Sequence, residues 1–351
     1  MATMAQAIRM ALHYAETYLG VTDIFGEDVG APLGGVFTVT QGLRTAWNGP
    51  LDERGTVGMA IGLAMAGQRP VAEIQFIDYI FNSIDLLKLA GATHWSSHGD
   101  WSLPMVLRSP VGSGIRGSVY HSHSFDATAT HIAGWKIVIP STPLDAYGLM
   151  ISACQDLNPV MFLEPKALLR VRGEELIPGE PLDDRALSKM IDAPLGDRSQ
   201  WKPQWPELEG YSVPIGKAKK VRSGEHVTAV SYGRTLPLCT KAAGKLAEEG
   251  IEVEVIDLRS LWPYDWEMIR QSVKKTGRVL FVNEDTEVSN FGEHLIRRTV
   301  DELFFQLLAA PKLLAGKFIP GIGLADALEM ASVPQLADIE KALRDLANAE
   351  P

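Results

Sequence analysis

Short apolar segments alternate with helical segments along most of this chain, and that order narrows the fold more than any other feature. The first series of buried strands is expected at residues 21–25, 70–76, 103–107, 132–140 and 159–163. A second series is expected at residues 227–231, 251–257 and 279–282. Because strands that alternate with helices build a parallel sheet covered on both faces, the sequence predicts an α/β protein.

The two series of strands predict two domains, since 351 residues exceed the usual size of a single core. We expect an α/β domain at residues 1–170 and a smaller α/β domain at residues 215–351. Residues 171–214 between them are rich in proline and charge and show little periodicity, which predicts a linker. We expect its Trp201 and Trp205 to pack on one of the domains or on a partner.

The charge and cysteine content exclude several classes of protein. A formal net charge of −10 disfavours nucleic acid and anionic membranes as partners. Only Cys154 and Cys239 are present, far apart, which disfavours a disulfide framework or zinc site and indicates a reducing compartment. The first residues lack the apolar core of a signal peptide, and no apolar run is long enough to span a bilayer. We therefore expect a cytoplasmic protein.

Residues 50–62 carry the first candidate for chemistry, the carboxylate of Glu53. Gly55, Gly58 and a run of small apolar residues follow it, which predicts a buried, closely packed helix. A carboxylate at the mouth of such a helix is partly desolvated and suited to hold or pass a proton. The alternative is that Glu53 only caps the helix, and this stretch alone favours that alternative.

Other polar residues stand where predicted strands end. Glu27 and Asp28 follow the first strand, and Gln75 and Tyr79 lie at or just beyond the end of the second. In open α/β sheets, ligands bind at the carboxyl edge of the strands. A plain acidic turn explains Glu27 equally well.

Residues 112–117 match the pattern G-x-G-x-x-G, but we reject a dinucleotide site there. No helical apolar face follows the glycines, and the nearest acids, Asp126 and Asp145, come too early and too late. The segment instead predicts a flexible loop that presents His121 and His123, which we expect to point to opposite sides. Two histidines beside a glycine hinge favour a function, whereas metal binding lacks a third ligand at suitable spacing.

Several strings together resemble the β subunit of the E1 component of 2-oxoacid dehydrogenases, in the right order and over nearly the whole chain. They are FGEDVG, PLDERGTVGMAIGLAMAG, AEIQFIDYIF, YHSHS, KIVIPSTP, NPVMFLEPK and VIDLRSLWPYD. The resemblance is strongest to the branched-chain enzyme, and the pyruvate and acetoin enzymes are relatives. It implies a transketolase-like fold, with an N-terminal pyrimidine-binding domain for thiamine diphosphate and a smaller C-terminal domain.

The implied reaction is the oxidative decarboxylation of a 2-oxoacid, with branched-chain substrates favoured and pyruvate next. The acyl group would pass to the lipoyl group of an E2 acyltransferase. Acetoin cleavage with the same cofactor and a non-catalytic assembly subunit remain alternatives. Retention of Glu53, Tyr79 and His121 together argues against the non-catalytic alternative.

The resemblance also implies roles for single residues. Glu53 would hydrogen-bond N1′ of the cofactor's aminopyrimidine, and Tyr79 would stack on that ring. Glu27 and Gln75 would line the same pocket. His121 would help transfer the acyl group to the lipoyl dithiolane as a proton donor.

The chain lacks the GDG motif and the downstream NN with which thiamine enzymes hold Mg²⁺ and diphosphate. Gly99-Asp100 continues to Trp101, and Gly196-Asp197 continues to Arg198. The resemblance therefore implies that an E1 α subunit supplies the Mg²⁺ half of the site, in an α2β2 heterotetramer. It also implies a structural K⁺ bound by backbone carbonyls, at Leu103, Met105, Val106, Ala153, Asp156 and Asn158.

The sequence departs from the family pattern in several places. Residues 182–210 look like an insertion, and residues 319–330 diverge from the usual segment. His123 stands where many members have glutamine, and Ser289-Asn290 where they often have glycines. These departures leave the preferred 2-oxoacid and the E2 partner open.

Overall fold

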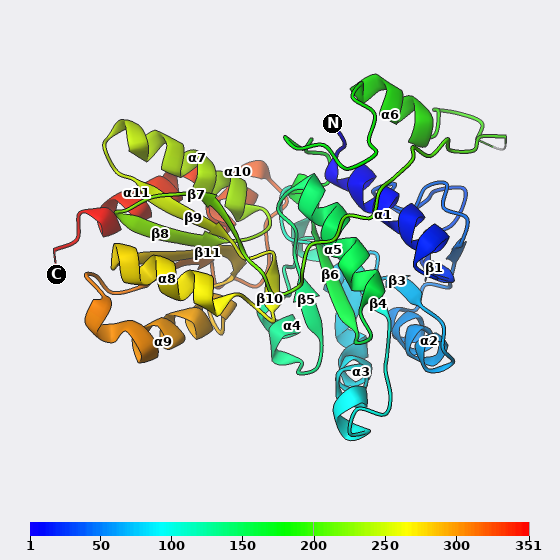
Figure 1. The fold of residues 1–351 in the computed structure, drawn as a ribbon, viewed down its shortest axis with the longest axis horizontal. Helices are drawn as coiled ribbons and strands as arrows, with labels where there is room; N and C mark the ends of the chain where they lie inside the picture. Colours follow the sequence, from blue (N-terminus) through cyan, green and yellow to red (C-terminus); the bar gives the residue numbers. More distant parts are fainter. Residues whose placement is uncertain (199, 351) are drawn as a thin grey trace. The chain divides into compact units, whose positions relative to one another are not determined.

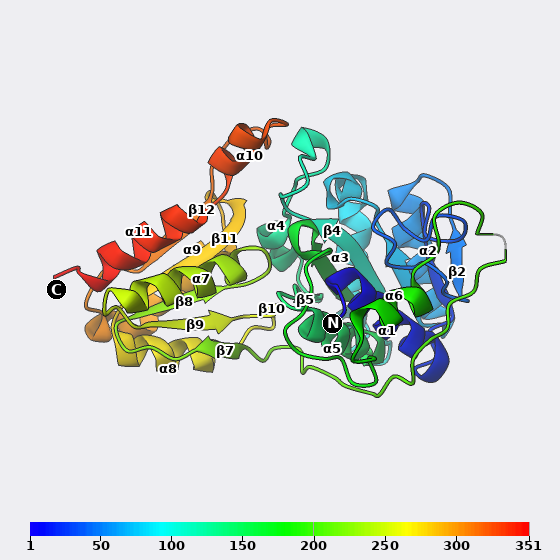
Figure 2. The same ribbon diagram turned by 90° about the horizontal axis from the view of Figure 1, so that it is seen from above.

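The computed structural model describes residues 1–198 and 200–350, and the chain forms two compact units. The first unit contains residues 1–110, 132–164 and 168–215. The second contains residues 111–131, 165–167 and the chain from residue 216 onward. Each unit is a sheet with helices on both faces, which confirms the predicted α/β class (Figures 1 and 2). The domain and linker boundaries predicted from the sequence, 1–170, 171–214 and 215–351, remain predictions.

The first unit is built on a sheet with the strand order β5-β6-β4-β3-β1-β2. The pairings of β1 with β2 and β3, of β3 with β4, and of β5 with β6 are parallel. Its strands are β1 (Asp23–Gly26), β2 (Ala46–Asn48), β3 (Pro70–Glu73), β4 (Val106–Val111), β5 (Lys136–Val138) and β6 (Val160–Pro165). Its helices are α1 (Met4–Tyr18), α2 (Glu53–Met65), η1 (Ile77–Ser83), α3 (Ile84–Ser96), α5 (Pro143–Gln155) and α6 (Asp184–Ile191).

Helices α1 and α5 pack together on one face of this sheet, and α2 packs on α3 on the other (Figure 1). Helix α1 forms because its apolar residues recur every three or four positions and are buried on one face. Thr3 starts it with a capping box, in which the Thr3 side chain accepts from the Gln6 N–H and Gln6 accepts from the Thr3 N–H.

The second unit has the strand order β12-β11-β8-β9-β7, with only β7 antiparallel to its neighbour among the pairings described. Its strands are β7 (Lys219–Arg222), β8 (Val227–Ser231), β9 (Val253–Asp257), β11 (Val279–Thr286) and β12 (Lys312–Gly316), and β10 (Ser260–Trp262) follows β9. Its helices are η2 (Ser118–Tyr120), α4 (Asp126–His131), α7 (Thr235–Glu248), α8 (Trp266–Thr276), α9 (Phe291–Leu303), η4 (Phe304–Gln306), α10 (Asp326–Ser332) and α11 (Leu336–Ala347). Helix α7 packs on α11, and α8 packs on α9.

The proline-rich segment 171–214 is more ordered than its sequence indicates. It contains α6, which packs on α1: Gln6 donates to Asp192 Oδ2 at 2.8 Å, and Arg9 is paired with Asp192 at 2.9 Å. The ring of Trp205 stacks on His13 with centroids 4.0 Å apart, which confirms that this tryptophan packs on a domain. The segment is therefore attached to the first unit along much of its length.

No helix among residues 1–198 and 200–350 has both the length and the apolar character needed to cross a bilayer.

A buried ion triad joins three neighbouring strands of the first unit. Arg108 on β4 donates to both carboxylate oxygens of Glu164 on β6, at 2.7 and 2.9 Å, and also contacts the carboxylate of Glu73 on β3. All three side chains are almost fully buried. Because a buried charge is tolerated only when it is paired, the triad locks these strands in one register.

Replacing Arg108 with methionine should destabilise the chain by roughly 3–5 kcal/mol, because two buried carboxylates would lose their cation. Urea unfolding of the two proteins measures the difference. Arg54→Met is the matched control, since Arg54 pairs with Asp85 at the exposed surface and its loss should change little. Similar small effects of both substitutions would contradict the importance of the triad.

Candidate functional site

Glu27 and Gln75 emerge at the same edge of the first sheet. Strands β1 and β3 are parallel neighbours in which Gly26 lies opposite Glu73, so the residues that follow both strands leave the sheet side by side. Gly26 has a φ of 155°, and a Cβ there would come within 2.5 Å of the Glu73 carbonyl oxygen. Glycine is therefore required for the close approach of the two strand ends.

Glu53 is the first residue of α2, and the adjacent Asp52 performs the capping. The Asp52 carboxylate accepts a hydrogen bond from the Gly55 N–H at 2.9 Å, as an N-cap residue does. Glu53 is half-buried and accepts from the Asn82 side chain at 3.4 Å. The alternative that Glu53 serves as the helix cap is therefore wrong.

Glu27 lies in a partly buried, acidic environment to which Asp28 and Glu53 contribute negative charge. Burial raises the pKa of Glu27, and the negative charges of Asp28 and Glu53 raise it further. A group of carboxylates of this kind favours a ligand that donates protons or hydrogen bonds, and it disfavours a phosphate. A ligand group that is positively charged or carries N–H donors therefore fits this edge of the sheet.

An exposed aromatic ring lies on the element that packs against α2. Tyr79 belongs to η1, its side chain is 39% exposed, and its N–H donates to the Phe76 carbonyl at 3.1 Å. Phe76 itself is buried, with its ring edge-on to Phe37 at 6.1 Å. Phe76 therefore fills the core, while Tyr79 lies at the surface.

The six backbone carbonyls expected to bind K⁺ belong to two segments that lie side by side. The Leu103 N–H donates to the Leu157 carbonyl at 2.9 Å, and the Val160 N–H donates to the Met105 carbonyl at 3.0 Å. A carbonyl oxygen has two lone pairs, so acceptors such as Met105 and Ala153 can still ligate a cation. Among the described residues, no group of three His, Cys, Asp or Glu side chains offers a metal site.

The loop that carries His121 is closed by its own hydrogen bonds in the second unit. The Gly112 N–H donates to the His123 carbonyl at 2.8 Å, and the His121 N–H donates to the Gly117 carbonyl at 3.1 Å. His121 Nδ1 lies 2.6 Å from the Tyr120 carbonyl. Since a carbonyl only accepts, Nδ1 carries the proton of the neutral ring, and Nε2 is the nitrogen that can gain one.

The expectation that His121 and His123 point to opposite sides is wrong. Ser122 and Ser124 are buried, whereas both histidines are half-buried. In an extended segment, side chains alternate between two faces, so residues two apart share a face. Both imidazoles therefore belong to the less buried side of the loop.

Sequence reasoning missed a buried acidic cluster beside this loop. Asp126 lies at the start of α4 and is 1% exposed. Burial raises its pKa well above the usual value, and the charges of Asp285 and Glu284 raise it further. The Ala127 N–H donates to Asp285 at 3.0 Å, which brings the two acids together.

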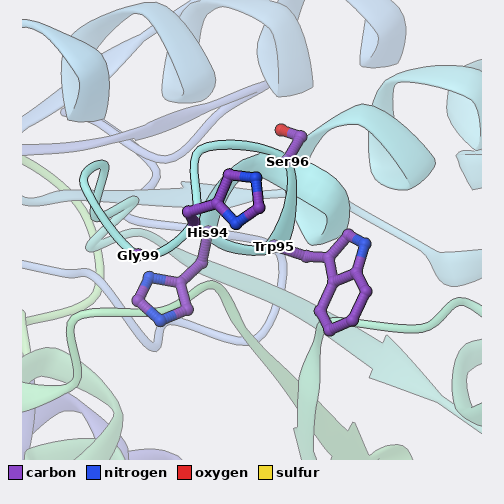
Figure 3. A pocket seen from close by; sticks show the side chains of 5 residues that line it. His94, Trp95, Ser96 and Gly99 are labelled. Carbon is purple, nitrogen blue, oxygen red and sulfur yellow. The ribbon is translucent and has the colours of Figure 1, made fainter.

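A shallow hollow of about 490 Å³ at the end of α3 carries no such arrangement. It is lined by His94, Trp95, Ser96, His98 and Gly99. Figure 3 shows that these side chains diverge around the turn rather than converge on a point. The indole of Trp95 is 86% exposed. The hollow therefore offers no chemistry comparable to the edge of the sheet.

Comparison with known proteins agrees with the fold. Residues 1–172 match the family described as transketolase, pyrimidine binding domain, and residues 216–339 match transketolase, C-terminal domain. A solved structure titled "Split gene transketolase, inactive beta4 tetramer" aligns over 100% of both chains with a TM-score of 0.71 and 16% identity. The fold is therefore that of the transketolase class.

Sequence relatives define the family within that class. A 2-oxoisovalerate dehydrogenase subunit beta from Bacillus subtilis is 37% identical and covers 92% of both chains. A pyruvate dehydrogenase E1 component subunit beta from Acholeplasma laidlawii is 37% identical over 99% of both. The acetoin:2,6-dichlorophenolindophenol oxidoreductase subunit beta of Cupriavidus necator is 34% identical over 89% of this chain and 84% of its own. The chain belongs to the family of E1 β subunits of 2-oxoacid dehydrogenases.

The raised pKa of Asp126 predicts a pH-dependent contribution to stability. The folded chain holds a proton there that the unfolded chain releases above a pH of about 4, so the free energy of unfolding falls as the pH rises. Asp126→Asn removes this contribution. Urea unfolding from about pH 5 to about pH 8 should show that the free energy of unfolding of the variant rises relative to that of the wild type.

Asp301→Asn, at the exposed surface, is the control for that experiment. A difference between Asp126→Asn and wild type that stays constant over the whole pH range would show that Asp126 is ionised in the folded chain.

Proposed function

We propose that this chain is the β half of a thiamine-diphosphate-dependent 2-oxoacid dehydrogenase, with branched-chain 2-oxoacids preferred and pyruvate next. One observation carries the proposal: Glu53 stands beside Glu27 at the carboxyl edge of the first sheet and is relieved of the capping role by Asp52. The similarity to 2-oxoisovalerate and pyruvate dehydrogenase β subunits supports the substrate class.

The residues of the first unit would bind the pyrimidine end of the cofactor. When bound, thiamine diphosphate supplies a nucleophilic carbon and an electron sink for decarboxylation. Glu53 would hold or pass a proton at N1′ of the aminopyrimidine, since its carboxylate is half-buried and aimed by the start of α2. Tyr79 would stack on the ring, and Glu27 and Gln75 would bind its polar edge.

A partner α subunit would complete the site. The acidic edge around Glu27 and Glu53 disfavours a diphosphate, and the chain lacks the GDG motif, so Mg²⁺ and the diphosphate would be held by the α chain. Met59, Tyr79, Phe81 and Leu89 expose apolar surface on α2, η1 and α3, as a subunit interface would require. An α2β2 heterotetramer in the cytoplasm follows from this reading.

The carbonyls of Leu103, Met105, Val106, Ala153, Asp156 and Asn158 would hold K⁺. The hydrogen bonds that join their two segments support this proposal, because they bring the carbonyls to one place. The Lys136 ammonium lies 2.5 Å from Asp156 Oδ2 and occupies that side chain, so the backbone oxygens would be the ligands.

His121 would act in the second half-reaction, acyl transfer to the lipoyl group of an E2 acyltransferase. A dithiolane sulfur that leaves as a thiolate needs a proton, and the imidazole of His121 would supply it from Nε2. The proton on Nδ1 is fixed by the Tyr120 carbonyl, so the ring is oriented for this task.

Glu53→Gln should reduce decarboxylation by about 10²-fold or more, because an amide cannot exchange a proton at N1′. The measurement is turnover of branched-chain 2-oxoacids by the chain co-expressed with its α subunit. Assembly should be intact, since Asp52 still caps α2. Asp52→Asn is the matched control, because asparagine also caps and the effect should be small.

In the same assay, the chain without an α subunit should be inactive. Robust decarboxylation by the chain alone, or near-wild-type turnover of Glu53→Gln in the assembled enzyme, would overturn the proposed function.

His121→Ala should separate the two half-reactions. Decarboxylation with an artificial electron acceptor should persist, whereas reductive acylation of a lipoyl domain should fall by roughly 10²-fold or more. His123→Ala is the comparison; it removes the neighbouring imidazole from the same side of the loop and should act more weakly. Equal loss of both half-reactions in His121→Ala, or a larger effect at His123, would mean that the step or the histidine is wrongly assigned.

The similarity to the Cupriavidus necator protein supports acetoin cleavage as the alternative function. Turnover of acetoin against branched-chain 2-oxoacids by the same assembled enzyme separates the two. A non-catalytic assembly role would be indicated if the assembled enzyme turned over neither substrate.

A further inference from the structure

The glycine-rich neck of the His121 loop is bound by a carboxylate of β11. Glu284 Oε2 accepts hydrogen bonds from the Ser113 N–H at 3.1 Å and from the Ser113 hydroxyl at 2.6 Å. A Cβ on Gly112 would come within 2.0 Å of Glu284 Oε1, and Gly112 has a φ of 79°. Only glycine at position 112 therefore allows the carboxylate to reach the loop backbone.

A second carboxylate, on α10, binds the next residues of the same neck. Glu329 Oε1 accepts from the Gly114 N–H at 2.8 Å and from the Arg116 N–H at 3.3 Å. Glu329 is buried, with 7% of its surface exposed. A buried carboxylate that accepts two backbone N–H groups is a strong anchor, because these bonds are charge-assisted.

Residues of β11, of α10 and of the segment just before α10 also contact the rest of the His121 loop. Asp326 of α10 pairs with Arg116, and a Cβ on Gly321 would come within 2.5 Å of Val119. After the histidines, the Ala127 N–H donates to Asp285 of β11. The chain from Gly112 to Ala127 is therefore held before and after His121 by side chains that follow it by more than 150 residues.

We propose that Glu284 and Glu329 are positioning residues for acyl transfer, which hold the backbone of the loop so that His121 is presented to the lipoyl group. The proposal rests on the function proposed for His121. In this proposal, β11 and α10 contribute to acyl transfer by positioning the His121 loop, in addition to any docking role of the C-terminal domain.

Conservative and disruptive variants of Glu329 test the proposal in the assembled enzyme. Glu329→Ala removes both acceptors, so reductive acylation of a lipoyl domain should fall by about tenfold or more. Decarboxylation with an artificial electron acceptor should change less than about twofold, because Glu329 touches no group assigned to that step. Glu329→Gln should recover most of the acylation, since its amide oxygen still accepts from the two N–H groups.

Glu249→Ala is the matched control. Glu249 is a carboxylate of the same unit that pairs with Arg344 at the exposed surface, so both half-reactions should be unchanged. Gly112→Ala provides an independent arm, because it displaces Glu284 without removing a carboxylate. It should lower acylation and spare decarboxylation, as Glu329→Ala does.

Amide hydrogen exchange of the assembled enzyme gives a readout that does not depend on activity. The amides of Gly114 and Arg116, which donate to Glu329, should exchange faster in Glu329→Ala and at the wild-type rate in Glu329→Gln and Glu249→Ala. Unchanged exchange in Glu329→Ala, equal loss of both half-reactions, or a Glu329→Gln variant as impaired as Glu329→Ala would overturn the proposal.

The two proposals can fail separately. If His121→Ala leaves acylation intact while Glu329→Ala lowers it and speeds amide exchange, the function assigned to His121 fails and the anchoring stands. If His121→Ala lowers acylation while Glu329→Ala changes neither exchange nor acylation, the positioning proposal fails and the function of His121 stands.

Discussion

The ion triad of Arg108 with Glu73 and Glu164 is the constraint on which the first unit depends. It joins β3, β4 and β6, where buried charges leave no freedom for a shift of register. Two residues beyond Glu73 the chain reaches Gln75, and four residues beyond Arg108 it reaches Gly112, the start of the His121 loop. One polar cluster in the core thus fixes where two functional segments leave the sheet.

The two units use carboxylates in different ways. At the edge of the first sheet, Glu27 and Glu53 are half-buried and repel each other, which suits exchange of a proton with a bound ring. In the second unit, Glu284 and Glu329 are nearly buried and satisfied by N–H donors, which suits anchoring. The same kind of side chain is therefore a repelled, half-buried carboxylate in one unit and a satisfied acceptor in the other, according to the donors around it.

Local patterns in the sequence predicted most of the strands and the edge of the first sheet. The expected strand at residues 227–231 is β8 to the residue, because a continuous apolar run between turn residues leaves little choice. Helix α6 was missed because it lies within the proline-rich segment, although Leu187, Met190 and Ile191 recur at helical spacing and pack on the core.

The anchors of the His121 loop could not be found from the sequence. Glu284 and Ser113 are 171 residues apart, and their contact depends on how β11 and the loop pack. The orientation of the histidines was a different failure, since the alternation of faces along an extended segment was applied wrongly to His121 and His123. The resemblance to a family assigned residues their roles, but it gave no account of what holds them in place.

The neighbouring carboxylates Asp52 and Glu53 separate two demands that one residue often has to meet. Asp52 stabilises the start of α2 as its N-cap residue, so Glu53 is not needed for capping. Under the proposed function, change at position 52 would alter how much folded protein accumulates, whereas change at position 53 would alter the reaction that the folded protein catalyses. Selection can act on abundance and on chemistry at these adjacent positions independently, so the active site can vary without a cost to folding.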